Sequence, residues 1–189
     1  MAIIIIGKTA SGKDSIANRL VSDYGYKRIV TYTTRPMREG EVQNVTYHFV
    51  SNDEFDDKVK QNFFAEWKQY NTEFGIWYYG TALEDLINAD ENTIVILTPD
   101  GYRDVLKKSI KKPTSIYIYA NNETIKKRLL KRGDDKNEAQ RRLNHDNIDF
   151  NGIQNEVDKI IYNNDETNIE EVVHKIVEFL NERRALHIE

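Results

Sequence analysis

The sequence contains no cysteine and no long apolar run. The missing cysteines exclude disulfide bonds, thiolate metal sites and a cysteine nucleophile. No stretch approaches the roughly 20 apolar residues that a transmembrane helix requires. The apolar segment at residues 2–6 lacks a basic region and a cleavage site, so we expect a strand there rather than a signal peptide. We therefore expect a cytoplasmic protein that does not contact a membrane.

An excess of positive charge is also missing. The chain has 27 Lys and Arg against 31 Asp and Glu, a net charge of −4, which argues against a dedicated nucleic-acid binder. The four histidines are scattered without metal-ligand spacing. Apolar residues make up 39% of the 189 residues, enough for the core of one compact α/β domain.

Buried strands alternate with helices along much of the chain. Buried strands are expected at 2–6, 93–97 and 115–120, and a fourth strand is expected at 159–162. Helices are expected at 14–24, 82–89, 99–110, 123–131, 136–148 and 168–183. This alternation predicts an α/β fold with a parallel β-sheet core and helices on both faces.

Two regions interrupt the alternation. Residues 32–81 hold many aromatic residues, with strands expected at 45–50 and 63–70 and a short helix between them. Residues 132–150 hold a glycine-containing break and a charged helix. Both are expected to be insertions that move over a site at the carboxyl ends of the strands.

The segment GKTASGKDS, residues 7–15, follows the first expected strand and opens a helix. Its spacing is that of a phosphate-binding loop, in which backbone N–H groups and the helix dipole attract phosphate. Lys13 is placed to reach the β- and γ-phosphates of a nucleotide. The next position usually carries a Ser or Thr hydroxyl that helps to hold Mg2+, and here it is Asp14.

Asp14 has two interpretations that the sequence leaves open. Its carboxylate can hold Mg2+ directly or through a water molecule, because Mg2+ prefers oxygen ligands. Alternatively, it only stabilises the start of the helix by interacting with the helix dipole.

Further motifs resemble the guanylate kinase family. The segment TYTTRPMREGEVQNVTYHFVS, residues 31–51, is similar to that family's T-T-R-x-x-R-x-G-E pattern and the Tyr-x-Phe-Val strand that follows it. The other similar segments are AEW at 65–67, YYGT at 78–81, KKRLLKRG at 126–133, RRL at 141–143 and IIYNND at 160–165. The resemblance extends from residue 3 to about residue 180.

The resemblance implies a P-loop kinase that transfers the γ-phosphate of ATP to GMP with Mg2+, giving ADP and GDP. ATP and GMP are then the expected partners, and no nucleic acid is expected. One domain would span 1–189. Its parts would be a core at 1–31, 82–121 and 151–189, a monophosphate-binding insert at 32–81 and a lid at 122–150.

The resemblance also assigns the acceptor residues. Those that would hold the GMP phosphate are Arg35, Arg38, Tyr47 and Tyr79, which supply charged and phenolic donors. Those that would read the base or lie beside it are Thr31, Glu66 and Thr81. A buried Glu66 would select guanine because guanine N1 and N2 offer it two N–H donors, whereas adenine offers no such pair.

The donor residues follow from the loop and the lid motifs. Those that would bind ATP are Gly7, Lys8, Thr9, Ala10, Ser11, Gly12, Lys13, Asp14 and Arg128. The catalytic residues would be Lys13, Arg132 and Arg142, which would neutralise charge on the transferring phosphoryl group. Asp14 is the candidate metal ligand.

The chain departs from the family pattern at three places. Asp14 is the first. Ile96 and Thr98 are the second, because the family usually carries Asp-x-Asp there, with Asp100 two residues further on. The third is a longer connection at 71–77. Two alternatives therefore stay open: a kinase of the same fold with a different nucleotide acceptor, and a non-catalytic guanylate kinase-like binding module.

Overall fold

The computed structural model describes residues 2–72, 74–108 and 112–186. The chain forms two compact units. Unit 1 comprises Met1–Ile4 and Lys27–Thr114, and unit 2 comprises Ile5–Tyr26 and Ser115–Glu189. Strand β1 (Ile3–Gly7) is divided between them. Four isoleucines fill β1, and all of them are buried, as expected for a strand covered on both faces.

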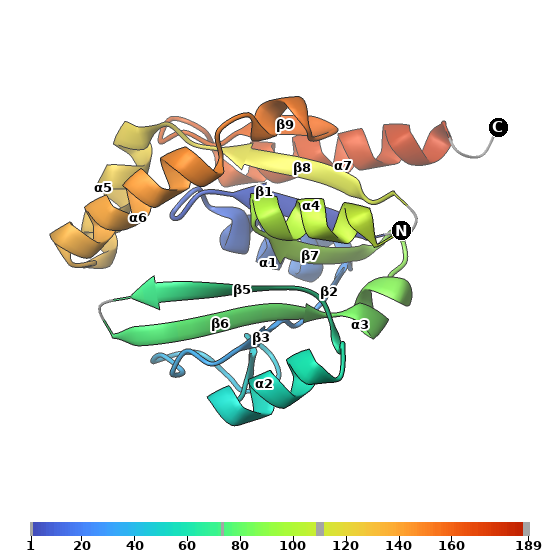
Figure 1. The fold of residues 1–189 in the computed structure, drawn as a ribbon. Coiled ribbons are helices and arrows are strands. Elements are labelled where there is room, and N and C mark those ends of the chain that lie inside the picture. Colours follow the sequence, from blue (N-terminus) through green and yellow to red (C-terminus); the bar gives the residue numbers. More distant parts are fainter. Residues whose placement is uncertain (1, 73, 109–111, 187–189) are drawn as a thin grey trace. The chain divides into compact units, whose positions relative to one another are not determined.

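Unit 1 contains a four-stranded sheet with the order β4-β3-β6-β5 (Figure 1). The strands of this sheet are β3 (Tyr32–Thr33), β4 (His48–Phe49), β5 (Phe64–Thr72) and β6 (Gly75–Ala82). β5 and β6 form a long antiparallel hairpin, β3 pairs antiparallel with β6, and β4 runs parallel to β3. Unit 1 also holds the parallel pair β2 (Lys27–Arg28) and β7 (Thr93–Leu97).

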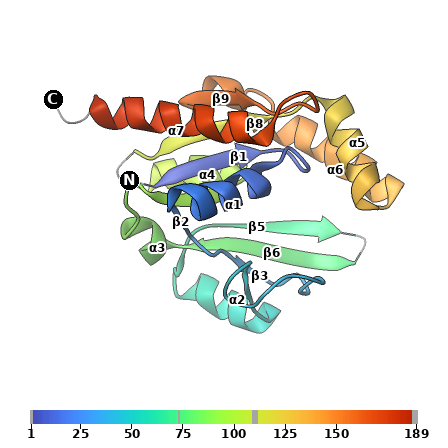
Figure 2. The same ribbon diagram turned by 180° about the vertical axis from the view of Figure 1, so that it is seen from behind.

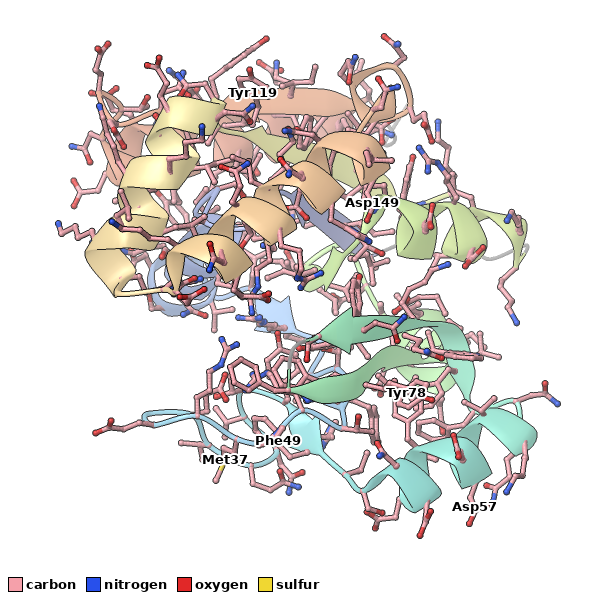
Figure 3. All side chains as sticks on the ribbon, turned by 60° about the vertical axis from the view of Figure 1, so that its left-hand side comes forward. Met37, Phe49, Asp57, Tyr78, Tyr119 and Asp149 are labelled. Atoms are coloured by element: carbon pink, nitrogen blue, oxygen red, sulfur yellow. The ribbon has the colours of Figure 1, made fainter. Side chains whose placement is uncertain are left out.

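The helices of unit 1 are α2 (Asn52–Lys60), α3 (Leu83–Ile87) and α4 (Pro99–Lys107). A capping box made by Ser51 and Glu54 starts α2, and the buried Phe55 of that helix stacks on Tyr78 of β6 (Figure 3 labels Tyr78). Thr98 caps α4 by accepting the Gly101 N–H, and Pro99 occupies the first turn, where a missing N–H costs nothing.

Unit 2 pairs β8 (Thr114–Tyr119) in parallel with β9 (Lys159–Tyr162). Its helices are α1 (Lys13–Tyr24), α5 (Asn122–Arg132), α6 (Lys136–Asp149) and α7 (Ile169–Ala185), with a short 3-10 turn at Ile153–Asn155. α1 packs against α7, and both are visible in Figure 2. Side-chain caps start three of the helices: Asn121 caps α5, Asp135 caps α6 and Asn168 caps α7.

The predicted α/β class, with a parallel sheet and flanking helices, is confirmed. The strands predicted at 93–97 and 159–162 have the predicted bounds. The end of the helix predicted at 99–110 lies partly outside the described residues, and the described part ends at Lys107. Among the residues that the structure describes, no helix is long and apolar enough to cross a membrane.

Unit 1 differs from the sequence prediction in two ways. The strand predicted at 45–50 is reduced to β4, because the preceding residues form a turn in which Asn44 has φ 63°. The strand predicted at 63–70 ends two residues later than predicted, since β5 extends to Thr72, and β6 begins at Gly75. Three strands, β2, β3 and β6, were not predicted individually. Two of them, β2 and β3, have only two residues each and are defined by pairing with distant strands.

Candidate functional site

In unit 2, the loop after β1 adopts a tight path that requires glycine at two positions. A Cβ on Gly7 would lie 2.5 Å from the Ser11 Oγ, and one on Gly12 would lie 2.3 Å from the Asn163 Nδ2. Gly12 also has φ +93°, a left-handed conformation that favours glycine. Lys13 folds back over the loop, and its Nζ donates to the Lys8 carbonyl at 3.2 Å.

The loop ends at the N-terminus of α1, where Gly12 occupies the cap position without a side-chain acceptor. The first N–H groups of a helix have no partner within the helix, and together with the helix dipole they favour an anion. The Ser11 Oγ is buried beside them and has no hydrogen-bond partner among the described residues. This donor set suits a phosphate group.

Two side chains hold the loop from outside. Asn163, directly after β9, donates its Nδ2 to the Ser11 carbonyl at 2.8 Å. Arg128 donates to the carbonyls of Ala10 and Ser11, both at 3.3 Å, and its Nε lies 3.5 Å from the Asp165 Oδ1. Arg128, predicted to bind ATP, therefore contacts the loop in this structure. Asn163 was not assigned a role from the sequence, although it lies in the IIYNND segment at 160–165, directly after β9.

Helix α6 also contacts the loop. Asp146 accepts the Thr9 backbone N–H at 2.6 Å, and Asn147 accepts from the Lys8 Nζ at 2.6 Å. Burial raises the pKa of the Asp146 carboxyl, while the bond from Thr9 and the charge of Lys13 oppose that rise. Burial likewise lowers the pKa of the Lys8 ammonium, with Asp146 opposing the change. No local sequence pattern singles out Asp146, because it lies in a helix that is polar on most of its surface.

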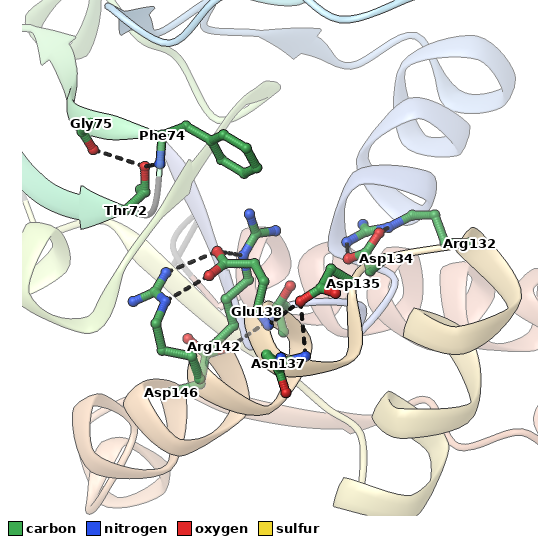
Figure 4. A network of polar contacts seen from close by, with 12 residues as sticks. Thr72, Phe74, Gly75, Arg132, Asp134, Asp135, Asn137, Glu138, Arg142 and Asp146 are labelled. Carbon is green, nitrogen blue, oxygen red and sulfur yellow. Dashed lines mark hydrogen bonds and ion pairs between the residues drawn. The ribbon is translucent and has the colours of Figure 1, made fainter.

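The lid arginines carry acidic partners (Figure 4). Arg142 donates its Nε to Glu138 at 2.7 Å, and Arg141 donates to both Glu138 oxygens at 2.7 and 2.9 Å. Hydrogen bonds from these arginines hold the pKa of the buried Glu138 carboxyl at about 2. Arg132 pairs with Asp134, which raises the pKa of its guanidinium, and the charge of Asp14 adds to that rise. Both predicted catalytic arginines are thus paired with acids.

In unit 1, Arg35 is almost fully buried and forks onto Glu41 with bonds of 2.9 and 2.7 Å. Its guanidinium lies over the Tyr47 ring, 5.5 Å from the centroid, and the Tyr47 and Tyr79 rings meet edge to face at 6.1 Å. The Arg38 N–H donates to the same Glu41 carboxylate at 2.7 Å. The structure therefore gathers predicted phosphate-binding residues around Glu41. This residue lies in the motif at 31–51, but no role was predicted for it.

Glu66 of β5 is the buried carboxylate of unit 1. Its Oε1 accepts the Thr81 hydroxyl at 2.6 Å. Burial raises the pKa of Glu66 to about 7, although the Thr81 bond and the charge of Lys68 oppose the rise. Thr31, half-buried before β3, has its carbonyl bonded to the His48 N–H at 2.9 Å.

The positions expected to carry Asp-x-Asp have other roles here. Ile96 lies within β7, and Thr98 uses its hydroxyl to cap α4. Asp100 is exposed, pairs with Arg103 at 3.0 Å and lies 3.8 Å from the Lys68 Nζ. Asp100 is thus paired with basic side chains of unit 1.

Within the described ranges, no group of three or more His, Cys, Asp or Glu side chains is arranged to hold a metal ion. Asp14 in the first turn of α1 offers one carboxylate. A single carboxylate suits Mg2+ that reaches a protein together with nucleotide phosphates and keeps several water ligands. The residues therefore fit a metal that arrives with its nucleotide.

Comparisons with known proteins agree with this geometry. The guanylate kinase family model matches residues 1–183. Guanylate kinase from Wolinella succinogenes is 30% identical over 98% of this chain and 86% of its own length. Guanylate kinase from Helicobacter hepaticus is 33% identical over 94% of this chain and 90% of its own length. The crystal structure of guanylate kinase from Anaplasma phagocytophilum covers 96% of this chain and 86% of its own with a TM-score of 0.68 and 22% identity, which supports the fold.

Proposed function

Because the chain belongs to the guanylate kinase family and is a nucleoside monophosphate kinase, we propose that it transfers the γ-phosphoryl group of ATP to GMP with Mg2+, giving ADP and GDP. The observation that carries the choice of GMP is Glu66, a buried carboxylate with one oxygen bonded to Thr81. An ionised Glu66 accepts the N–H groups of guanine N1 and N2, and a base without them would leave the charge unpaired. A cytoplasmic location belongs to the same proposal, and cell fractionation would test it.

In the proposed acceptor site, Arg35 and Arg38 bind the GMP phosphate with the phenols of Tyr47 and Tyr79. Bidentate arginine contacts suit a phosphate with two exposed oxygens. The contacts of Glu41 support this role, because they hold the Arg35 side chain and the Arg38 backbone in place. Thr31 and Thr81 would lie beside the base.

In the proposed donor site, the loop from Gly7 to Lys13 cradles the ATP phosphates. Lys13 would leave the Lys8 carbonyl for the β- and γ-phosphates. Asp14 would hold Mg2+ directly or through water, and the ion would neutralise charge on the phosphates. Arg128 would support the loop and contact the nucleotide from the start of the lid.

The proposed reaction is a direct, in-line transfer in which a GMP phosphate oxygen attacks the γ-phosphorus without a covalent enzyme intermediate. Arg132 and Arg142 would turn from Asp134 and Glu138 to the transferring group, where positive charge lowers the barrier. The parts proposed to move are the monophosphate-binding insert at 32–81 and the lid at 122–150, over a core at 1–31, 82–121 and 151–189.

One observation favours a second candidate, a kinase with another nucleotide acceptor. Thr98 is neutral, so Glu66 has no second carboxylate from that position to help it to read guanine. No observation in the described part of the chain favours a non-catalytic binding module.

The test is a coupled ADP-release assay with GMP, dGMP, AMP, CMP and UMP as acceptors. We expect GMP to give the highest kcat/KM, and Glu66→Gln to lower it for GMP by at least about tenfold, the value of one charged hydrogen bond. Arg38→Ala should weaken the binding of GMP without weakening the binding of ATP. A higher kcat/KM for AMP, CMP or UMP than for GMP would replace the proposal with the second candidate, and no turnover with any acceptor would reject both.

A further inference from the structure

Gly101 lies in the first turn of α4 without an evident backbone reason for being glycine. Its φ is not among the positive values found in the described residues, so its conformation is open to any L-residue. Glycine is among the poorest helix formers, and alanine is the best. Gly101 is nevertheless buried, and another side chain occupies the space beside it.

The carboxylate of Glu66 occupies that space. A Cβ on Gly101 would lie 2.8 Å from the Glu66 Oε2, 3.2 Å from its Cδ and 3.2 Å from the Thr98 Oγ1. The first of these separations is shorter than any ordinary contact between a methyl carbon and an oxygen. The helix therefore approaches the carboxylate as closely as it does only because residue 101 has no side chain.

Glu66 has little freedom to move away. Its Oε1 accepts the Thr81 hydroxyl at 2.6 Å, and the residue is buried. Lys68, two residues further along β5, donates to Asp104 of α4 at 3.0 Å and so ties the strand to the helix. A methyl group at position 101 would push the carboxylate from its place while leaving these backbone elements together.

We infer that Gly101 is a positioning residue for Glu66, and that its missing side chain fixes where the carboxylate meets the base of the acceptor nucleotide. The inference rests on the proposed function for its consequence: a base with two neighbouring N–H donors is recognised only while Glu66 keeps this position. The Thr98 hydroxyl accepts the Gly101 N–H at 3.1 Å, so Thr98 belongs to the same arrangement.

Gly101→Ala is the first test. Because alanine suits a helix, the variant should fold, while its KM for GMP rises by at least about tenfold, as expected for a charged hydrogen bond lost from the acceptor. The KM for ATP should stay unchanged. The matched control is Leu106→Ala, an exposed position in the same helix, which should alter neither KM.

A double variant separates positioning from general damage. Glu66→Asp shortens the side chain by one methylene and removes the clash with a methyl group at 101. Gly101→Ala should therefore raise the KM for GMP much less in the Glu66→Asp background than in the wild type. Additive effects, an unchanged KM for GMP in Gly101→Ala, or an equal rise in KM for GMP and ATP would overturn the inference.

A measurement without nucleotide keeps the inference testable if GMP is not the acceptor. The Glu66 carboxyl titrates at about 7 because it is buried, and its carboxyl carbon can be followed by NMR against pH. Gly101→Ala should move this titration toward the ordinary glutamate range, and Leu106→Ala should not. An unmoved titration in Gly101→Ala would overturn the inference even if the wild type phosphorylates GMP rapidly.

Discussion

At the scale of single residues, burial sets the chemistry of Glu66. Its raised pKa of about 7 means that its carboxyl, in the proposed acceptor site, is partly protonated near neutral pH. A protonated Glu66 has a proton where guanine needs an acceptor. We therefore predict that kcat/KM for GMP rises with pH through one ionisation near 7, measured in initial-rate assays from about pH 5.5 to 8.5. Glu66→Gln should lack this ionisation, and the same pH profile in both proteins would assign the ionisation to another group.

Lys13 supports a second prediction at this scale. Within the described residues, the hydrogen bond of its Nζ is to the Lys8 carbonyl. Removal of the Lys13 side chain should therefore change the stability of the fold little. We predict that Lys13→Ala lowers kcat by about 100- to 1000-fold, the usual loss when a group that stabilises transition-state charge is removed. Circular dichroism should show an unchanged fold. Wild-type turnover in a folded Lys13→Ala protein would place phosphate binding elsewhere.

At the scale of elements, Glu138 organises the start of α6. It lies under Arg141 and Arg142, three and four residues further along the helix, and its pKa of about 2 shows that the ionised form is the stable one. We predict that Glu138→Gln destabilises the protein by about 1–3 kcal/mol in urea at pH 7, because a buried acceptor of charged hydrogen bonds is lost. It should also change kcat, because Glu138 then no longer holds Arg142, which is proposed to act on the transferring phosphoryl group. Glu123→Gln, an exposed acid in α5, is the control, and equal stability of the two variants would contradict the prediction.

The start of α1 carries the prediction for Asp14. If its carboxylate takes part in placing Mg2+, Asp14→Asn should raise the Mg2+ concentration that gives half-maximal rate at saturating nucleotides, and Asp14→Ser should be milder. Asp14→Asn also loses a favourable helix-dipole interaction of about 0.3–1 kcal/mol, so melting must be measured in parallel. An unchanged Mg2+ dependence with only a small loss of melting temperature would leave Asp14 as a residue that stabilises the helix start.

At the scale of the whole molecule, two carboxyl groups whose pKa values are shifted in opposite directions make the stability of the fold depend on pH. The Glu138 pKa is lowered to about 2, so its contribution is complete above about 4.5 and is lost as the pH falls toward 2. The Glu66 pKa is raised to about 7, so folding takes up a proton there and stability falls as the pH rises from about 4.5 through 7. Urea unfolding from pH 3 to 9 should therefore show a maximum on the acid side of neutrality. Glu66→Gln should flatten the decline toward neutral pH, and an unaltered decline would contradict this account.

The sequence predicted those parts that depend on neighbouring residues. The buried strand β1 and the glycine loop follow from local patterns, because backbone geometry involves residues only a few positions apart. The short strands β2 and β3 could not be predicted in the same way, since only pairing with distant strands defines them.

The sequence by itself therefore determined the α/β class, the phosphate loop and, through its motifs, the family to which the chain belongs. The tertiary structure alone decided which side chains support the candidate sites. Asn163 reaches the Ser11 carbonyl across 152 positions of the chain, Asp146 reaches Thr9 across 137, and Gly101 meets Glu66 from another element. Such contacts leave no local pattern, because only folding brings their partners together. The pKa of Glu66 is decided in the same way, since its main cause is burial by distant segments.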